Sequence, residues 1–479
     1  MTKLGKQQTS KPYLRVLIFG FVALVAITIL VVEPFDLPNG LSTSAALILL
    51  VVGALATGLI SEQITILIFF LLAMLLAIAS PQVVFSGFYS GAFWLVFGGL
   101  IIGAAVETTG LGDRIARTLI EYISGSYKWV VAAIVLINCI FIFLMPSTLS
   151  RVVLLIPVVT SLSEQMGYSR GSKPANGLVM ATVLTAYLCS TSVLPANVPN
   201  NVLMGASETF LDVRIRYFEY FLLHFPILGL LKAIIIWACV VYLFKPSNLD
   251  TKKPASNVRV LEKTKTKLLQ DEKRILILLM GALMLWATDS VHGITPAWVS
   301  LAFGILCLFP KLGVVSPAEF REKVPMGPLL YVAGIIGIGA VVADSGLGDY
   351  LSKVMIEASN LSPEKPIEGF IVLSSVAMFL SFFSTMPGVP AIMIPLAPDL
   401  QTASGLPLKT VVMTQVVGFS SVWLPYQVPP IIVGMQLAGV PMGVGVKVTS
   451  LIALLSIILL TPLLVLWWQF LGYLPQGGI

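Results

Sequence analysis

Apolar runs separated by short polar breaks recur along the chain from Tyr13 almost to its C-terminus. A helix needs about 20 residues to cross the hydrocarbon core of a bilayer. On this criterion the sequence predicts eleven membrane spans, two of them interrupted by polar residues and prolines. The spans are expected at residues 13–32, 44–60, 63–80, 91–109, 176–210 (interrupted), 218–244, 274–290, 295–311, 327–345, 407–438 (interrupted) and 445–472.

Two further apolar regions, about 129–163 and about 368–400, contain a polar tip with proline in place of a continuous span. The tips are Met145–Arg151 and Ser384–Pro390, and the apolar arm on each side is expected to be too short to cross the membrane. Irregular backbone at membrane depth is tolerated where protein or a wet cavity surrounds it. The pattern therefore predicts two re-entrant hairpins, with two ordinary helices kinked by proline as the alternative.

The two halves of the chain also match each other in sequence. The matching pairs are Glu107–Asp113 with Ala343–Asp349, Pro157 with Pro395, and Leu194–Asn200 with Leu424–Pro430. An odd number of spans in each copy gives the second copy the opposite orientation, so the sequence predicts two inverted repeats. The expected parts are an N-terminal tail with the first anchor span (1–43), a first inverted repeat (44–244), a cytoplasmic linker (245–274) and a second inverted repeat (275–479).

Composition narrows the class of protein. Of the 479 residues, 57% are hydrophobic and 11% are charged, whereas a typical globular domain carries about 25% charged residues. This excludes a water-soluble enzyme and a nucleic-acid-binding protein, and it predicts an all-α polytopic membrane protein with one membrane domain. Neither a Walker A motif nor a metalloprotease or hydrolase motif occurs, so we expect no enzymatic activity, no resident cofactor and no metal site.

The positions of the basic residues predict the orientation in the membrane. Nine of the 29 Lys and Arg residues lie between Lys245 and Arg274, and cytoplasmic loops are enriched in such residues. The linker and the N-terminal tail are therefore expected in the cytoplasm. Only three charged residues follow Pro395, so the C-terminus is expected outside a plasma (inner) membrane that the chain crosses many times.

Candidate binding chemistry gathers at the hairpin tips and at the interruptions of the two broken spans. A broken helix frees N–H groups that attract an anion and carbonyl groups that attract a cation, and hydroxyls can serve both ions. The expected substrate-binding residues are Ser147, Thr148, Ser384, Thr385, Asn200 and Arg151, and the expected cation-binding residues are Ser147, Asn197, Thr385 and Gln427. The alternative is that the hydroxyls bond only to nearby backbone.

Arg151 is the only charged residue between Lys128 and Glu164. A guanidinium at bilayer depth costs about 2.5 to 3.5 kcal/mol on the mildest scale, so it is expected to face a cavity or a partner. We expect it to attract an anionic substrate or to occupy the space of a coupling cation. The alternatives are a side chain that reaches the cytoplasmic surface and an ion pair with a carboxylate.

Charged and aromatic residues alternate from Asp212 to Phe221. This pattern is typical of an amphipathic helix that lies in the membrane interface. Such a helix could couple a moving part of the protein to a fixed part.

The layout resembles the divalent anion/sodium symporter family of the ion transporter superfamily. Besides the hairpin tips and the broken spans, the resemblance rests on Trp94–Gly99 leading to Gly110–Gly112. In that family a Ser-Asn-Thr triplet at each tip and Thr-Pro-Pro-Asn loops on the broken spans bind carboxylate and Na⁺. The first triplet aligns with Ser147, Thr148 and Leu149, and the second with Thr385, Met386 and Pro387. The two loops align with Asn197–Asn200 and Gln427–Pro430. Neither triplet is intact.

The resemblance implies a homodimer that works by an elevator-like movement. Together with the residues above, it predicts a secondary active transporter for a small anion, either a di- or tricarboxylate, with Na⁺ as coupling ion. Its partners are then this anion and the lipid bilayer, without nucleic acid. The alternatives are a proton-coupled or exchange-type permease for another anion such as sulfate, and an integral-membrane enzyme or scaffold that transports nothing.

Overall fold

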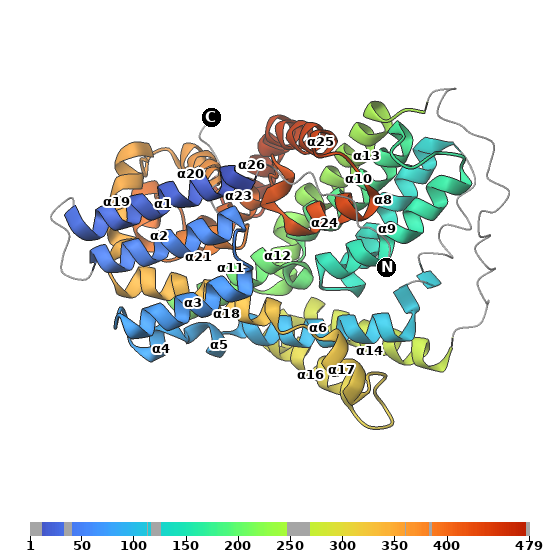
Figure 1. Cartoon of the computed structure of the whole chain (residues 1–479), viewed down its shortest axis with the longest axis horizontal. Helices are drawn as coiled ribbons and strands as arrows, with labels where there is room; N and C mark the ends of the chain where they lie inside the picture. The colour runs from blue at the N-terminus through green and yellow to red at the C-terminus, as the bar shows by residue number, and fades with distance from the viewer. Residues whose placement is uncertain are drawn as a thin grey trace.

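The computed structural model describes residues 12–32, 41–112, 114–115, 126–246, 269–359, 361–382 and 386–475. These residues are predominantly helical and none of them forms a β-strand (Figure 1), which confirms the all-α class. The predicted N-terminal tail up to residue 11 and most of the predicted linker, residues 247–268, lie outside the described residues.

Among the described residues, five helices are long and apolar enough to cross a membrane, and further apolar helices are shorter. The long ones are α6 (Gly91–Thr109), α8 (Tyr127–Leu144), α12 to α13 (Tyr217–Leu243), α18 (Gly327–Asp344) and α25 to α26 (Met442–Phe470). The shorter ones include the segment Val16–Val31 of α1 (Pro12–Val32), α2 (Leu41–Thr57), α3 (Glu62–Leu75) and α16 (Pro296–Leu308). α14 (Gln270–Ala287) has 18 residues and carries charges in its first turn. The count of eleven spans stays a prediction.

Glycine ends the same helix in both halves of the chain. Gly110 follows α6 with φ of 71°, and Gly346 lies just beyond α18 with φ of 76°. Positive φ is strained for residues with a Cβ but not for glycine, which is therefore common just after a helix. The matching Gly-Leu-Gly segments thus stop two matching helices by the same local mechanism.

Both predicted interruptions are present. The first span divides into α10 (Lys173–Leu188), two short 3₁₀ turns (Ser190–Ser192 and Leu194–Ala196) and α11 (Val198–Leu211). The second divides into α23 (Leu408–Phe419), a 3₁₀ turn (Pro425–Gln427) and α24 (Pro429–Ala438). Each break contains one proline, Pro195 or Pro425, and a further proline lies in the first turn of the following half-helix. Proline lacks the N–H that a continuous helix needs.

The first hairpin region differs from the prediction in the length of its arms. Both α8 and α9 (Thr148–Gln165) have 18 residues. The expectation of an arm too short to cross is therefore wrong for α8, which is among the helices long and apolar enough to cross, whereas α9 is not among them. Pro157 lies inside α9 without ending it. The second region does have shorter arms: α20 (Pro366–Leu380) precedes the tip, and α21 (Gly388–Met393) and α22 (Ala397–Ser404) follow it.

The predicted interfacial helix at residues 212–221 is also wrong in part. Asp212 is in the left-handed region with φ of 50°, residues 212–216 are not helical, and α12 (Tyr217–His224) continues into the long helix that ends at Leu243. A π-helical segment, Phe225–Leu231, interrupts this helix, and Ser456–Leu460 interrupts the last one in the same way. Pro226 lies inside the first π-helical segment, and Pro462 lies just after the second. Proline lacks the N–H that an α-helical hydrogen bond needs, which favours the wider π-helical turn at these places.

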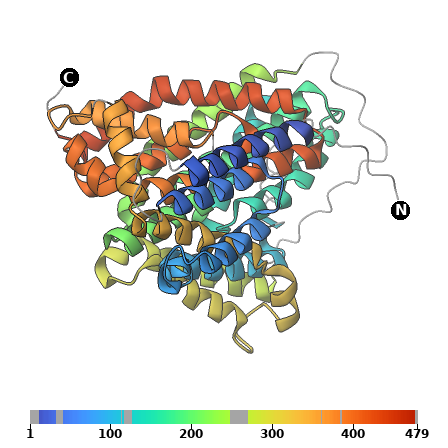
Figure 2. The same cartoon turned by 60° about the vertical axis from the view of Figure 1, so that its left-hand side comes forward.

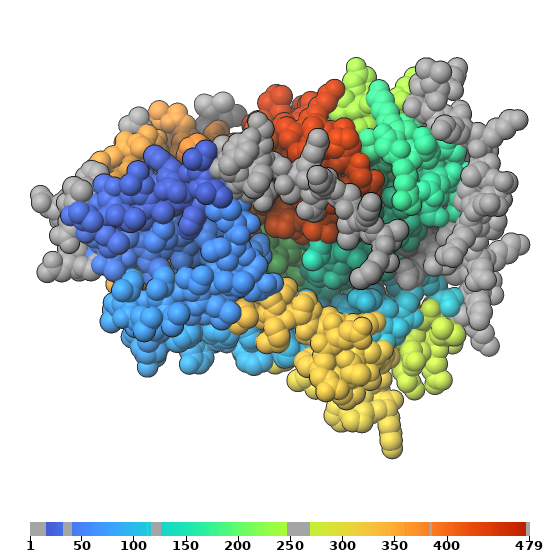
Figure 3. Space-filling model, in the orientation of Figure 1, coloured from blue at the N-terminus to red at the C-terminus, as the bar shows by residue number. Residues whose placement is uncertain are grey.

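Helices of each predicted repeat pack against helices of the other repeat, and matching helices do so in matching ways. The pairs are α6 with α14 and α16, α18 with α2 and α3, α24 with α9 and α10, and α11 with α21 and α23. Figures 1 and 2 show α2 and α3 (blue) beside α18 (yellow to orange), and Figure 3 shows the blue and yellow segments adjoining on one face. Neither predicted repeat therefore buries its apolar surface alone.

Candidate substrate site

Arg151 projects from the first turns of α9 into the break between α10 and α11. The side chain is fully buried. Its guanidinium donates hydrogen bonds to the carbonyl oxygens of Met145, Ala186 (2.9 Å) and Ala196 (3.1 Å) and to the Thr148 hydroxyl (3.0 Å). The first hairpin tip is thus joined to the broken span by a positive charge that neither reaches the surface nor contacts a described carboxylate.

The two polar side chains predicted at the first tip have different surroundings. Thr148 is buried and its hydroxyl also donates to the Ala196 carbonyl, 3.4 Å away. Ser147 is only partly buried and caps α9, because its hydroxyl accepts from the backbone N–H of Ser150 (3.2 Å). Thr148 therefore lies at the break, whereas Ser147 makes the local backbone bond that the alternative interpretation expects.

Two asparagines order the first break. Asn197 caps α11 by accepting from the Asn200 N–H (3.1 Å). The Asn200 amide donates to the carbonyls of Val193 (2.8 Å) and Ser190 (3.2 Å), and its oxygen has no partner among the described residues. Asn200 is therefore a buried acceptor that is available to a ligand.

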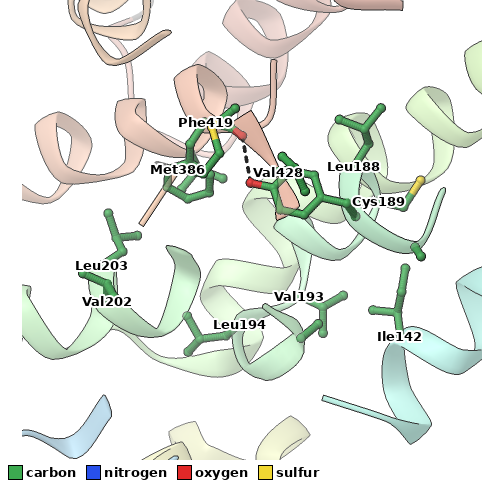
Figure 4. Packing of buried hydrophobic residues seen from close by; sticks show 14 of the residues in the cluster. Ile142, Leu188, Cys189, Val193, Leu194, Val202, Leu203, Met386, Phe419 and Val428 are labelled. Carbon is green, nitrogen blue, oxygen red and sulfur yellow. Dashed lines mark hydrogen bonds between the residues drawn. The ribbon is translucent and has the colours of Figure 1, made fainter. Parts of the chain in front are cut away.

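Gln427 connects the second break to the second hairpin. Its side-chain oxygen accepts from the N–H groups of Trp423 (2.9 Å) and Leu424 (2.8 Å), and its amide donates to the carbonyl (3.0 Å) and hydroxyl (2.7 Å) oxygens of Ser381. Ser384 and Thr385 lie outside the described residues. Met386, directly after them, is buried beside Phe419 and faces α11 (Figure 4).

A second buried cation was not expected from the sequence. Lys232, at the start of α13, is 1% exposed, and its ammonium donates to the carbonyl (2.9 Å) and hydroxyl (3.0 Å) oxygens of Ser420, directly after α23. The available signal was a single lysine inside the apolar run 218–244. This lysine does not by itself predict a buried cation, because a long basic side chain can also extend to the membrane surface.

Gln415 is a further buried polar residue that sequence reasoning missed. Its side chain is fully buried on α23, and neither amide atom has a partner among the described residues. α23 packs against α11 and against the first 3₁₀ turn of the break, and the Tyr187 hydroxyl of α10 reaches the Phe419 carbonyl (3.3 Å; Figure 4, dashed line). An amide can donate or accept, so Gln415 can serve a bound solute.

The arrangement places positive charge where two half-helices end. The C-terminal end of a helix carries a partial negative charge and unpaired carbonyls. Arg151 bonds to a carbonyl near the end of α10, and Lys232 bonds to one directly after α23. Within the described ranges, no cluster of His, Cys, Asp and Glu is suited to a metal ion. Two buried positive charges therefore lie beside the broken spans.

Comparison with known proteins indicates the class of this protein. A family model described as "Sodium:sulfate symporter transmembrane region" matches residues 15–474. The L-tartrate/succinate antiporter of Escherichia coli K12 is 24% identical over 358 residues, which are 72% of each chain. The inner membrane protein YbhI of the same organism is 23% identical and covers 82% of this chain and 78% of its own.

The fold is also similar to a solved one. The crystal structure of the Alcanivorax borkumensis YdaH transporter superimposes with a TM-score of 0.52 at 14% identity, and it covers 90% of this chain and 99% of its own. The described helices therefore form a known membrane-transporter architecture.

Proposed function

The chain belongs to the sodium:sulfate symporter family, that of the divalent anion/sodium symporters, and from this premise we propose that it exchanges small dicarboxylate dianions across the membrane. Family membership makes it a multi-pass membrane transporter for anions and not an enzyme. The substrate class and the exchange mode are our proposal. The L-tartrate/succinate antiporter similarity supports both.

The observation that carries the proposal is the pair of buried cations without a carboxylate partner among the described residues. A charge inside the membrane is expensive unless a partner neutralises it. Arg151 and Lys232 together contribute two positive charges beside the broken spans. A dicarboxylate dianion cancels both charges, so the loaded carrier is close to neutral and the empty carrier is not. We therefore expect reorientation only with substrate bound, which is exchange.

Na⁺ symport is the second candidate, and the description of the family model favours it. Na⁺ would bind to unwound backbone carbonyls and to the C-terminal ends of half-helices. In the first break, the Arg151 guanidinium already bonds to the carbonyls of Ala186 and Ala196. A positive charge that belongs to the protein thus takes the position that Na⁺ would take, which supports exchange over symport.

Other features of the mechanism remain part of the proposal. We expect two inverted repeats, an elevator-type movement in a homodimer, a cytoplasmic N-terminus and an external C-terminus. Matching helices of the two halves each pack against helices of the opposite half, and this symmetry supports the two inverted repeats.

Counterflow in proteoliposomes tests the proposal. Uptake of labelled succinate is expected to accelerate when the vesicles contain unlabelled succinate, and to respond neither to a Na⁺ gradient nor to a proton gradient. Empty vesicles that accumulate succinate under a Na⁺ gradient would establish symport instead.

A further inference from the structure

A pocket lies apart from the two breaks. It has a volume of about 700 Å³, and three parts of the chain line it: residues 214–216, one face of α12 and the segment 289–296, which connects α14 to α16. Lys409, at the start of α23, completes the wall. We call this the Arg214 pocket.

The charges of the Arg214 pocket are unevenly paired. Lys409 and Glu219 form an ion pair of 2.6 Å, and the Tyr473 hydroxyl also bonds to Glu219. Arg214 and Arg216 are exposed and make no ion pair in the described part of the chain. Two guanidiniums therefore remain available, and guanidinium binds carboxylate through paired hydrogen bonds.

Asp289 gives the pocket a second kind of recognition. The side chain is 4% exposed, and one carboxylate oxygen accepts from the Tyr217 N–H. The other oxygen is buried and has no partner in the described ranges. A buried carboxylate oxygen is costly to leave unpaired, so a ligand that donates a hydrogen bond here is favoured. The hydroxyl of a hydroxycarboxylate supplies such a donor beside its carboxylates.

α12 lies between this pocket and the candidate substrate site. Phe218, Glu219 and Leu222 line the pocket. On the opposite face, the Tyr220 hydroxyl donates to the Thr191 carbonyl in the first break (2.7 Å), and α12 packs against both 3₁₀ turns there. One helix, α12, therefore contacts both the pocket and the first break.

We propose that the Arg214 pocket is a second binding site for small hydroxycarboxylate anions, in which Arg214 and Arg216 bind the carboxylates and Asp289 accepts from the hydroxyl. The inference rests on the proposed function only for the class of ligand. It adds a docking site at which the anion is concentrated before it enters the break or after it leaves.

Binding of malate and succinate to the purified full-length protein in lipid-free detergent tests the proposal, because these two dianions differ by one hydroxyl. Wild-type protein is expected to bind malate in a tight and a weak phase. The double variant Arg214→Gln/Arg216→Gln should weaken the weak phase by about tenfold or more and leave the tight phase unchanged. Arg321→Gln, another exposed arginine, is the matched control and should change neither phase.

Asp289→Asn tests the hydroxyl specifically. The Asn side chain keeps an oxygen for the Tyr217 N–H, so the fold is retained while the unpaired carboxylate oxygen is lost. The preference of the weak phase for malate over succinate is expected to disappear in this variant. A preference unchanged from wild type would overturn the role of Asp289.

Two other results would overturn the site itself. One is a single-phase malate isotherm for the wild-type protein, or a weak phase that survives the double arginine change. The other is a weak phase that depends on added phosphatidylglycerol, since the arginines would then bind a lipid headgroup. If wild-type vesicles show succinate counterflow but malate binds in one phase, only this inference fails; without counterflow, the proposed function fails first.

Discussion

The two breaks occupy matching positions in the halves of the chain, but their backbone carbonyls use different donors. In the first break the Ser190 carbonyl accepts from the Asn200 amide, and Arg151 of the same repeat bonds to neighbouring carbonyls. Ser420 is the residue 230 positions after Ser190, and its carbonyl accepts from Lys232, which precedes the second repeat.

The sequence of the second break explains the difference. The residue 230 positions after Asn200 is Pro430, which has neither a side-chain donor nor an N–H. A buried carbonyl needs a donor, because leaving it unpaired costs about 1 to 3 kcal/mol. The ammonium of Lys232 fills this need from a different helix. Matching breaks in the backbone therefore do not require matching side chains, provided that each buried carbonyl finds a hydrogen-bond donor.

The largest effect is expected from Arg151→Gln. The variant removes one of the two buried positive charges and leaves the Ala186 and Ala196 carbonyls without their charged donor. Succinate counterflow should fall by on the order of 100-fold. Arg151→Lys, which keeps the charge but not the planar fork, should retain part of the activity. Wild-type exchange by the Gln variant would contradict the importance of the first cation; newly acquired Na⁺ dependence would support its role as a built-in cation.

Lys232→Gln is expected to have a smaller effect, about tenfold, because the amide can still donate to Ser420. With one site charge removed, a monoanion becomes the better match. Butyrate should therefore compete more strongly, relative to succinate, with labelled substrate in this variant than in wild type. Lys232→Arg, which keeps the charge, is the control, and an identical shift in that variant would exclude charge as the cause.

Gly434→Leu tests the packing of α24, in the second predicted repeat, against α9 and α10 of the first. A Cβ at this position in α24 would meet Val183 of α10 at 2.3 Å and Val152 of α9 at 2.7 Å. Overpacking of this kind typically costs about 1 to 3 kcal/mol, so the thermal unfolding midpoint should fall clearly. Gly443→Ala, where nothing lies within 4 Å, should leave the midpoint nearly unchanged. Equal midpoints for both variants would show that this contact contributes little.

The smallest effect is expected from Lys409→Gln, which removes the ion pair with Glu219 between α23 and α12. Both side chains are about one-third exposed. Exposed ion pairs contribute about 0.2 to 1 kcal/mol, and salt screens them. We expect the thermal unfolding midpoint to change by an amount near the detection limit in low salt and not to change in high salt. A large change in low salt would mean that the ion pair contributes more to stability than its exposure predicts.

The sequence by itself determined the class of protein, the two interrupted spans and the family. Long apolar runs require helices in a membrane, and both interruptions coincide with prolines, which lack the N–H that a continuous helix needs, so both follow from local chemistry. Pro157 shows the limit of that reasoning, because it lies inside α9 without ending it.

Only the tertiary structure decided which polar groups meet. Lys232 contacts Ser420 across 188 residues, and Arg151 joins three separate segments. No periodicity in the chain encodes these pairings, because they arise when helices of one half pack against the other half. Burial then makes an unpaired carbonyl or charge costly, and that cost selects the partners.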